Sequence, residues 1–105
     1  MNMKKSESSP LHRDTTKRIQ EDPEFAEAYI EALSESPINV QLAMLRRLRG
    51  LPQVKVASKL HAEQAFISRL EKSGSDHRVS IVSKAAKALH GRLVVLPEEA
   101  RVVFR

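Results

Sequence analysis

The sequence predicts a mainly α-helical protein with a helical arm at its N-terminal end and a small C-terminal β-hairpin. Three observations predict this fold class. Apolar residues recur at helical spacing over most of the chain. Proline and glycine divide that part into short segments of helix length. After Gly91 the pattern changes to two short runs rich in β-branched residues. A length of 105 residues suits one small domain with appendages.

The N-terminal part is predicted to be a disordered tail over residues 1–13 and a helical arm over residues 14–36. The tail is mostly polar and has no helical periodicity. In the arm, Asp22-Pro23-Glu24 indicates a helix start, because Asp caps a helix, Pro fits its first turn and an acid suits its dipole. One apolar stripe follows at i, i+4 and i+8: Phe25, Tyr29 and Leu33.

The central domain, residues 37–91, is predicted to contain four helices. Their expected ranges are about 38–49, 52–60, 63–72 and 80–89. Gly50 is expected to end the first of them, and His90-Gly91 the last.

The C-terminal extension, residues 92–105, is predicted to be the hairpin. Its two strands would be 92–96 and 101–104, joined across Pro97-Glu98-Glu99-Ala100. Two isolated strands are marginally stable, so the hairpin is expected either to close the domain or to pair with another chain as part of a dimer.

Charge is distributed unevenly along the chain. Residues 1–36 hold five basic and eight acidic residues, a net −3, whereas residues 37–91 hold ten basic and three acidic residues, a net +7. A segment this basic favours a polyanionic partner. It is equally compatible with an ordinary solvated cationic surface, so charge alone does not choose between the two.

Several functional classes lack support in the sequence. No apolar run approaches the length of a membrane span. The absence of cysteine rules out disulfides, thiolate zinc sites and cysteine nucleophiles, and fits a cytoplasmic protein. The four histidines show no metal-ligand spacing, and no glycine-rich phosphate loop or nucleophile motif occurs. We therefore expect no cofactor, no metal and no enzymatic activity.

The segment from Val54 to Leu70 has the spacing of two helices joined by a tight turn. Ala57 is the small residue needed where the helices cross, and His61, four residues later, occupies the turn. Histidine is one of the non-glycine residues found at positive φ. Ile67 and Leu70, at i and i+3, anchor the second helix. This is the spacing of a helix-turn-helix.

The same region resembles the XRE family, the Cro and lambda-repressor type of helix-turn-helix. The resemblance covers about residues 38–91 and rests on several positions in register: Leu45-Arg46, Gly50-Leu51-Pro52-Gln53, Ala57, Leu60, and Gln64 through Lys72. Two positions depart from the family pattern. His61 stands where glycine is usual, and Pro52 stands where a serine or threonine cap is usual. The implied fold is a lambda-repressor-like domain.

The resemblance also implies roles for individual residues. Gln64, Ala65 and Ser68 would point into the DNA major groove, where glutamine can bond an adenine edge. Gln53 would contact phosphate and brace Gln64. Two further cations of the recognition helix would contact phosphate or flanking bases: Arg69 and Lys72. Arg46 and Glu71 would form a structural ion pair.

The implied function is a sequence-specific DNA-binding repressor that acts as a homodimer on a palindromic operator. The acidic arm resembles the segment that precedes this domain in HigA-like antitoxins, which implies an antitoxin that neutralises a small basic toxin and represses its own operon. Its apolar stripe would then bind that toxin, or would pack on the chain's own helices. Two alternatives stay open: a stand-alone or phage-type regulator, and a protein-interaction module that no longer binds DNA.

Overall fold

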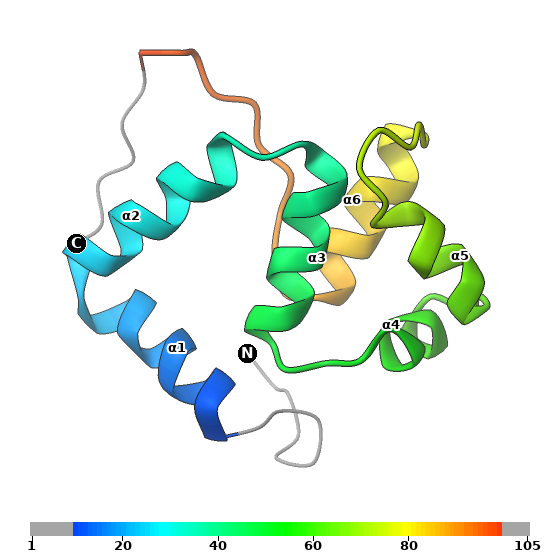
Figure 1. The fold of residues 1–105 in the computed structure, drawn as a ribbon, viewed down its shortest axis with the longest axis horizontal. Coiled ribbons are helices and arrows are strands. Elements are labelled where there is room, and N and C mark those ends of the chain that lie inside the picture. Colours follow the sequence, from blue (N-terminus) through cyan, green and yellow to red (C-terminus); the bar gives the residue numbers. More distant parts are fainter. Residues whose placement is uncertain (1–9, 100–105) are drawn as a thin grey trace.

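The computed structural model describes residues 10–99, which contain six α-helices and no β-strand (Figure 1). The helices are α1 (Pro10–Glu21), α2 (Pro23–Ser34), α3 (Ile38–Leu48), α4 (Gln53–Lys59), α5 (Gln64–Leu70) and α6 (Val79–Ala88).

The four helices expected between residues 37 and 91 are present, with ends close to those predicted. Gly50 follows α3 with a φ of 69°, a left-handed conformation that glycine adopts without strain. His90 follows α6 with a φ of 57°, and the next amide, Gly91 N–H, donates to the carbonyl of Ala86 at 2.8 Å. A residue in the left-handed conformation therefore ends each helix, and the amide that follows it donates to a carbonyl that has no partner within the helix.

One apolar core joins α3, α4, α5 and α6. Its most deeply buried large side chains are Ile67, Leu70, Leu89 and Val56. Around them the core is completed by Leu42, Leu51, Ala57, Val82, Ala85 and Ala86. This core holds α4 and α5 against α3 and α6, so the orientation of the α4–α5 pair is set by packing as well as by the turn between them.

The arm consists of α1 and α2, and α1 packs against both α2 and α3. Asp22 caps α2 as predicted, because its side chain accepts from the Phe25 N–H at 3.2 Å. Helix α1 begins at Pro10, four residues before the start predicted for the arm. Proline suits the first turn of a helix, and packing on two neighbours stabilises a segment that is mostly polar. Residues 1–9 of the predicted tail lie outside the described residues.

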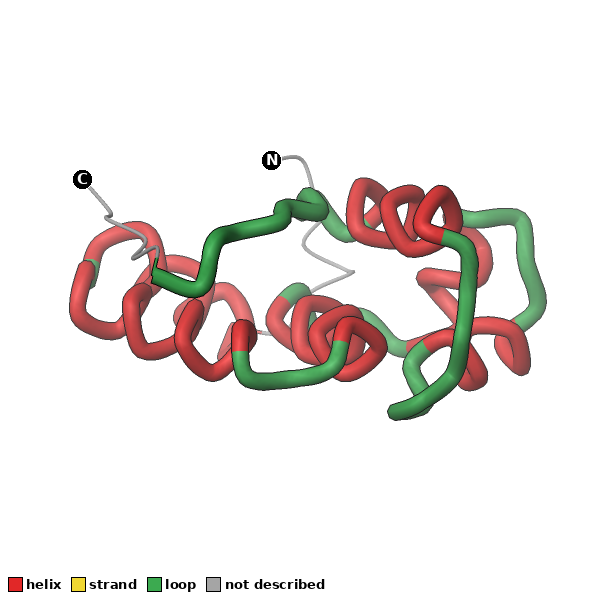
Figure 2. Tube along the Cα trace, turned by 90° about the horizontal axis from the view of Figure 1, so that it is seen from above, coloured by secondary structure: helices red, strands yellow, loops and turns green. Residues whose placement is uncertain are grey.

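The predicted C-terminal β-hairpin is wrong for the part of the chain that the structure describes. Residues 92–97 form no strand, and the chain turns at Glu98 and Glu99 (Figure 2). Within residues 10–99, no backbone hydrogen bond is made by residues 92–99. A strand needs a neighbouring backbone to pair with, so β-branched composition alone does not produce one. The second predicted strand, residues 101–104, lies outside the described residues.

Candidate nucleic-acid interface

The turn between α4 and α5 brings the two short helices into close contact. Ala57 is buried where they meet, and its carbonyl accepts from the Ala62 N–H at 2.9 Å. Between them His61 has a φ of 54°. This is the positive φ that the tight turn was expected to require, and it directs the chain from the end of α4 into α5 (Figure 1).

Helix α5 has one buried side and one exposed side. Ile67 and Leu70 face the core and are almost fully buried. The side chains predicted to read DNA lie on the other side: Gln64, Ala65, Ser68 and Arg69 are exposed, as is Lys72 just beyond the helix. The division follows from helical geometry, because residues three and four apart share a face. The predicted contact residues of α5 therefore form one continuous exposed strip.

A line of hydrogen bonds connects the interior of the domain to this strip. Arg46 donates to both carboxylate oxygens of Glu71, from Nε to Oε2 at 2.7 Å and from Nη2 to Oε1 at 3.0 Å. Gln53 Nε2 donates to the same Glu71 Oε1 at 3.0 Å, and Gln53 Oε1 accepts from Gln64 Nε2 at 3.0 Å. The ion pair and the bracing of Gln64 by Gln53, both implied by the resemblance, are thus present in one chain of contacts.

The inner end of this chain of contacts is shielded from water. The Arg46 and Glu71 side chains are only 12% and 8% exposed, and Arg46 Nη1 also donates to the carbonyl of Leu51 at 2.8 Å. A bidentate pair of this kind holds the guanidinium plane and the carboxylate plane in a fixed orientation. Glu71 therefore presents Oε1 to Gln53 in a defined position, and the amide of Gln53 orients Gln64 at the first residue of α5.

Exposed cationic side chains lie on both helices and just after α5. Lys55 on α4, Arg69 on α5 and Lys72 after α5 are all exposed. None of these three forms an ion pair with another residue in the range 10–99. The loop after α5 is tied down, since Ser75 Oγ donates to the carbonyl of Arg69 at 2.8 Å. The strip and its cations form a polar, positively charged surface on an ordered scaffold, which we call the α4–α5 face.

Sequence reasoning missed a residue that supports this face from behind. Asn39 on α3 is buried, and its Nδ2 donates to the carbonyl of Leu70 at 2.7 Å. Leu70 is the last residue of α5, where helix carbonyls lack partners within the helix. A polar residue among apolar neighbours at the start of a predicted helix was the available signal, although only the fold reveals its partner.

Helix α2, which carries the three arm residues predicted as a partner surface, lies apart from α4 and α5 (Figure 1). Phe25, Tyr29 and Leu33 are half-buried. The guanidinium carbon of Arg18 lies 4.0 Å from the centre of the Phe25 ring, and the Tyr29 hydroxyl donates to the carbonyl of Met44 on α3 at 3.4 Å. Burial raises the pKa of Tyr29, and the nearby Arg49 opposes that shift. The stripe is therefore partly occupied by the chain's own residues.

No helix within residues 10–99 is both long and apolar enough to cross a membrane. Comparisons with known protein families, with curated protein sequences and with solved structures find no match to this chain. The properties of the α4–α5 face and of the arm are consequently the basis for any function assigned to the protein.

Proposed function

We propose that this protein is a sequence-specific DNA-binding transcriptional repressor that reads the major groove with α5. One observation carries the proposal: Gln64, at the start of an exposed polar strip, is oriented by Gln53, which is itself bonded to Glu71 of the buried ion pair. A side chain held in this way has less freedom to lose when it bonds a base edge. The resemblance of this region to the XRE helix-turn-helix also supports the reading of DNA by α5.

Charge supports the same partner. The exposed cations on or next to α4 and α5, namely Lys55, Arg69 and Lys72, would contact the phosphates that flank a helix in the major groove. The whole segment from 37 to 91 carries a net +7. Phosphate contacts would supply affinity and orientation, while Gln64, Ala65 and Ser68 would supply the discrimination between sequences.

The experiment measures binding of the protein to its own promoter fragment and to random duplex DNA by fluorescence anisotropy. The double variant Gln64→Ala/Ser68→Ala is expected to bind the promoter about 30-fold more weakly and random DNA almost unchanged. The control Gln20→Ala/Ser80→Ala removes the same side-chain types from exposed positions on α1 and α6, and both affinities should be retained.

Two outcomes would contradict the proposal. An equal loss on promoter and random DNA would mean that Gln64 and Ser68 do not read bases. The absence of any salt-dependent binding by the wild-type protein would favour the interaction-module alternative, because phosphate contacts necessarily make affinity fall as salt rises.

Replacing Lys72 by Ala should reduce the slope of log affinity against log salt by about 1.

The finer form of the proposal is that the repressor is an antitoxin whose arm binds a small basic toxin. The supporting observation is that α2 exposes acidic side chains along its length, namely Glu24, Glu27 and Glu31. A basic partner would be complementary to this surface. Co-purification with the product of an adjacent short reading frame tests it. If no such product is encoded, the stand-alone regulator is favoured and DNA binding is unaffected.

A further inference from the structure

Glu63 brings an exposed carboxylate next to the residues proposed to read DNA. It directly precedes Gln64, the first residue of α5. Residues 37–91 contain only two other acidic side chains. Glu71 is shielded in its ion pair, and Asp76 lies in the loop beyond α5. Glu63 is therefore the one exposed acid that adjoins the cationic α4–α5 face.

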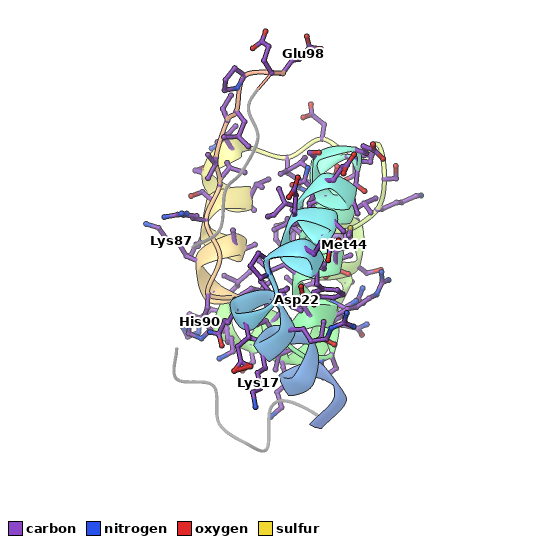
Figure 3. All side chains as sticks on the ribbon, turned by 90° about the vertical axis from the view of Figure 1, so that its left-hand side faces the viewer. Lys17, Asp22, Met44, Lys87, His90 and Glu98 are labelled. Atoms are coloured by element: carbon purple, nitrogen blue, oxygen red, sulfur yellow. The ribbon has the colours of Figure 1, made fainter. Side chains whose placement is uncertain are left out.

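Most other exposed acids of residues 10–99 lie on the arm or beyond α6, among them Glu24, Glu27, Glu31 and Glu98. Figure 3 views the molecule from the side that is at left in Figure 1, with the arm in front and Glu98 beyond α6. Helix α5 lies at the right of Figure 1. Acidic charge is thus mostly kept away from α5, and Glu63 departs from this separation.

The carboxylate of Glu63 has no partner within residues 10–99. Glu63 is the N-cap residue of α5, with a φ of −87° and a ψ of 152°, but its side chain makes no cap hydrogen bond. Short acceptors such as serine and aspartate are preferred at this position because they reach the amides of the first turn. Only the backbone of Glu63 serves the helix, since its carbonyl accepts from the Phe66 N–H at 3.0 Å. The side chain forms no ion pair in the described chain, so it is available to a ligand.

A carboxylate at this position has a defined effect on DNA binding. The N-terminal residues of a recognition helix are those that contact base edges. There a carboxylate is repelled by the phosphates and loses its water. Only a hydrogen-bond donor on the DNA can offset both effects, because a carboxylate accepts hydrogen bonds and donates none. Glu63 therefore penalises every sequence that offers no donor at its position.

Cytosine is the base whose major-groove edge fits this requirement. It presents an amino donor and no acceptor, whereas adenine presents its donor beside an acceptor, and guanine and thymine present no donor. We propose that Glu63 accepts a hydrogen bond from the amino group of a cytosine in the operator, next to the base pair that Gln64 reads. This inference rests on the proposed function and adds one base to the sequence that α5 selects.

The first experiment replaces each base pair of the promoter site in turn and measures binding by fluorescence anisotropy for the wild-type protein and for Glu63→Ala. At one C·G pair, adjacent to the pair whose preference Gln64→Ala abolishes, replacement should weaken wild-type binding about tenfold. The same replacement should weaken binding of Glu63→Ala less than about twofold. Random duplex DNA should bind Glu63→Ala about twofold more tightly, because one repulsive charge is gone.

The matched control is Asp76→Ala, which removes an exposed negative charge from the same basic segment. It should also tighten binding to random DNA slightly, but it should keep the wild-type preference at every base pair. A difference between Glu63→Ala and Asp76→Ala at the single C·G pair therefore separates base reading from a general effect of charge.

The second experiment tests for a new preference, which a misfolded variant cannot acquire. Glutamine bonds adenine through both the amino donor and the neighbouring acceptor. Replacing the C·G pair by A·T, which should cost the wild type about tenfold, should therefore cost Glu63→Gln less than about twofold. Helical content by circular dichroism should match the wild type in each variant, because the Glu63 side chain makes no contact that supports the fold.

Two results would overturn this inference alone. One is the lack of any C·G pair whose replacement affects the wild type more than Glu63→Ala, and the other is an unchanged preference for cytosine in Glu63→Gln. In both cases the loss of specificity in the variant Gln64→Ala would leave the proposed function standing. Failure of the wild-type protein to distinguish its promoter from random DNA would instead overturn both proposals.

Discussion

The α4–α5 pair and the C-terminal segment 92–97 differ in what their local patterns need in order to become regular structure. Helical spacing predicts α4 and α5, and both helices form. β-branched composition predicts a strand at 92–96, and none forms within the described chain. A helix satisfies its backbone groups within its own segment, whereas a strand satisfies them only through another backbone. A strand pattern is therefore conditional on a partner in a way that a helical pattern is not.

The two regions also differ in their long-range contacts. The α4–α5 pair is supported from α3 by two interactions, the Arg46–Glu71 ion pair and the bond from Asn39 to Leu70. The segment 92–97 is anchored to the core through Leu93 alone among its side chains. Substitutions in the supports of α4 and α5 should consequently change the free energy of unfolding strongly, and substitutions in the segment should hardly change it.

The largest expected effect is that of Glu71→Ala, which leaves the shielded Arg46 guanidinium without its partner. We expect the free energy of unfolding to fall by about 3 kcal/mol, measured by urea denaturation followed by circular dichroism. The double variant Arg46→Met/Glu71→Leu removes both charges and should recover most of that loss. A fall below about 0.5 kcal/mol for Glu71→Ala would mean that the α4–α5 pair does not depend on this contact.

Asn39→Ala should have the second-largest effect. It leaves the Leu70 carbonyl at the end of α5 without its donor in a buried environment, which costs about 2 kcal/mol. The same denaturation experiment measures it, and amide exchange should show faster opening of α5 than of α2. Uniformly faster exchange in all helices would show that Asn39 supports the whole fold and not α5 in particular.

His61→Gly should raise stability slightly. A residue other than glycine is strained at a φ of 54°, and glycine relieves that strain while losing more freedom on folding. The balance is a gain of about 0.5 kcal/mol. His61→Val serves as the opposite test, because a β-branched residue tolerates positive φ poorly. If both variants lose stability to the same extent, the imidazole contributes more than the turn conformation does.

The smallest expected effect is that of Val95→Ser in the extended segment. Measured at a low chain concentration, where association does not contribute, it should change the free energy of unfolding by less than about 0.5 kcal/mol. A larger loss would show that the segment stabilises its own domain, and the contrast with the α4–α5 pair would then disappear.

Sequence reasoning predicted the elements that carry their own signals. Proline and glycine ends, the Asp22 cap and apolar spacing predicted the helices from α2 to α6, and family resemblance predicted the Arg46–Glu71 pair. Three features depend on tertiary partners that the local sequence does not specify. These are the start of α1 at Pro10, the burial of Asn39 and the lack of a strand at residues 92–97 within the described part of the chain. The role of α5 in reading DNA stays a prediction.

The line of hydrogen bonds from Arg46 to Gln64 ends at the first residue of α5 and leaves the next exposed positions out of the network. Within residues 10–99, Ala65 and Ser68 make no side-chain hydrogen bond, and neither belongs to the apolar core. Most substitutions at exposed positions of this kind change the free energy of unfolding by less than about 0.5 kcal/mol. Residues 65 and 68 can therefore be replaced, by divergence or by design, so that the surface exposed by α5 changes while the scaffold that holds the helix stays the same.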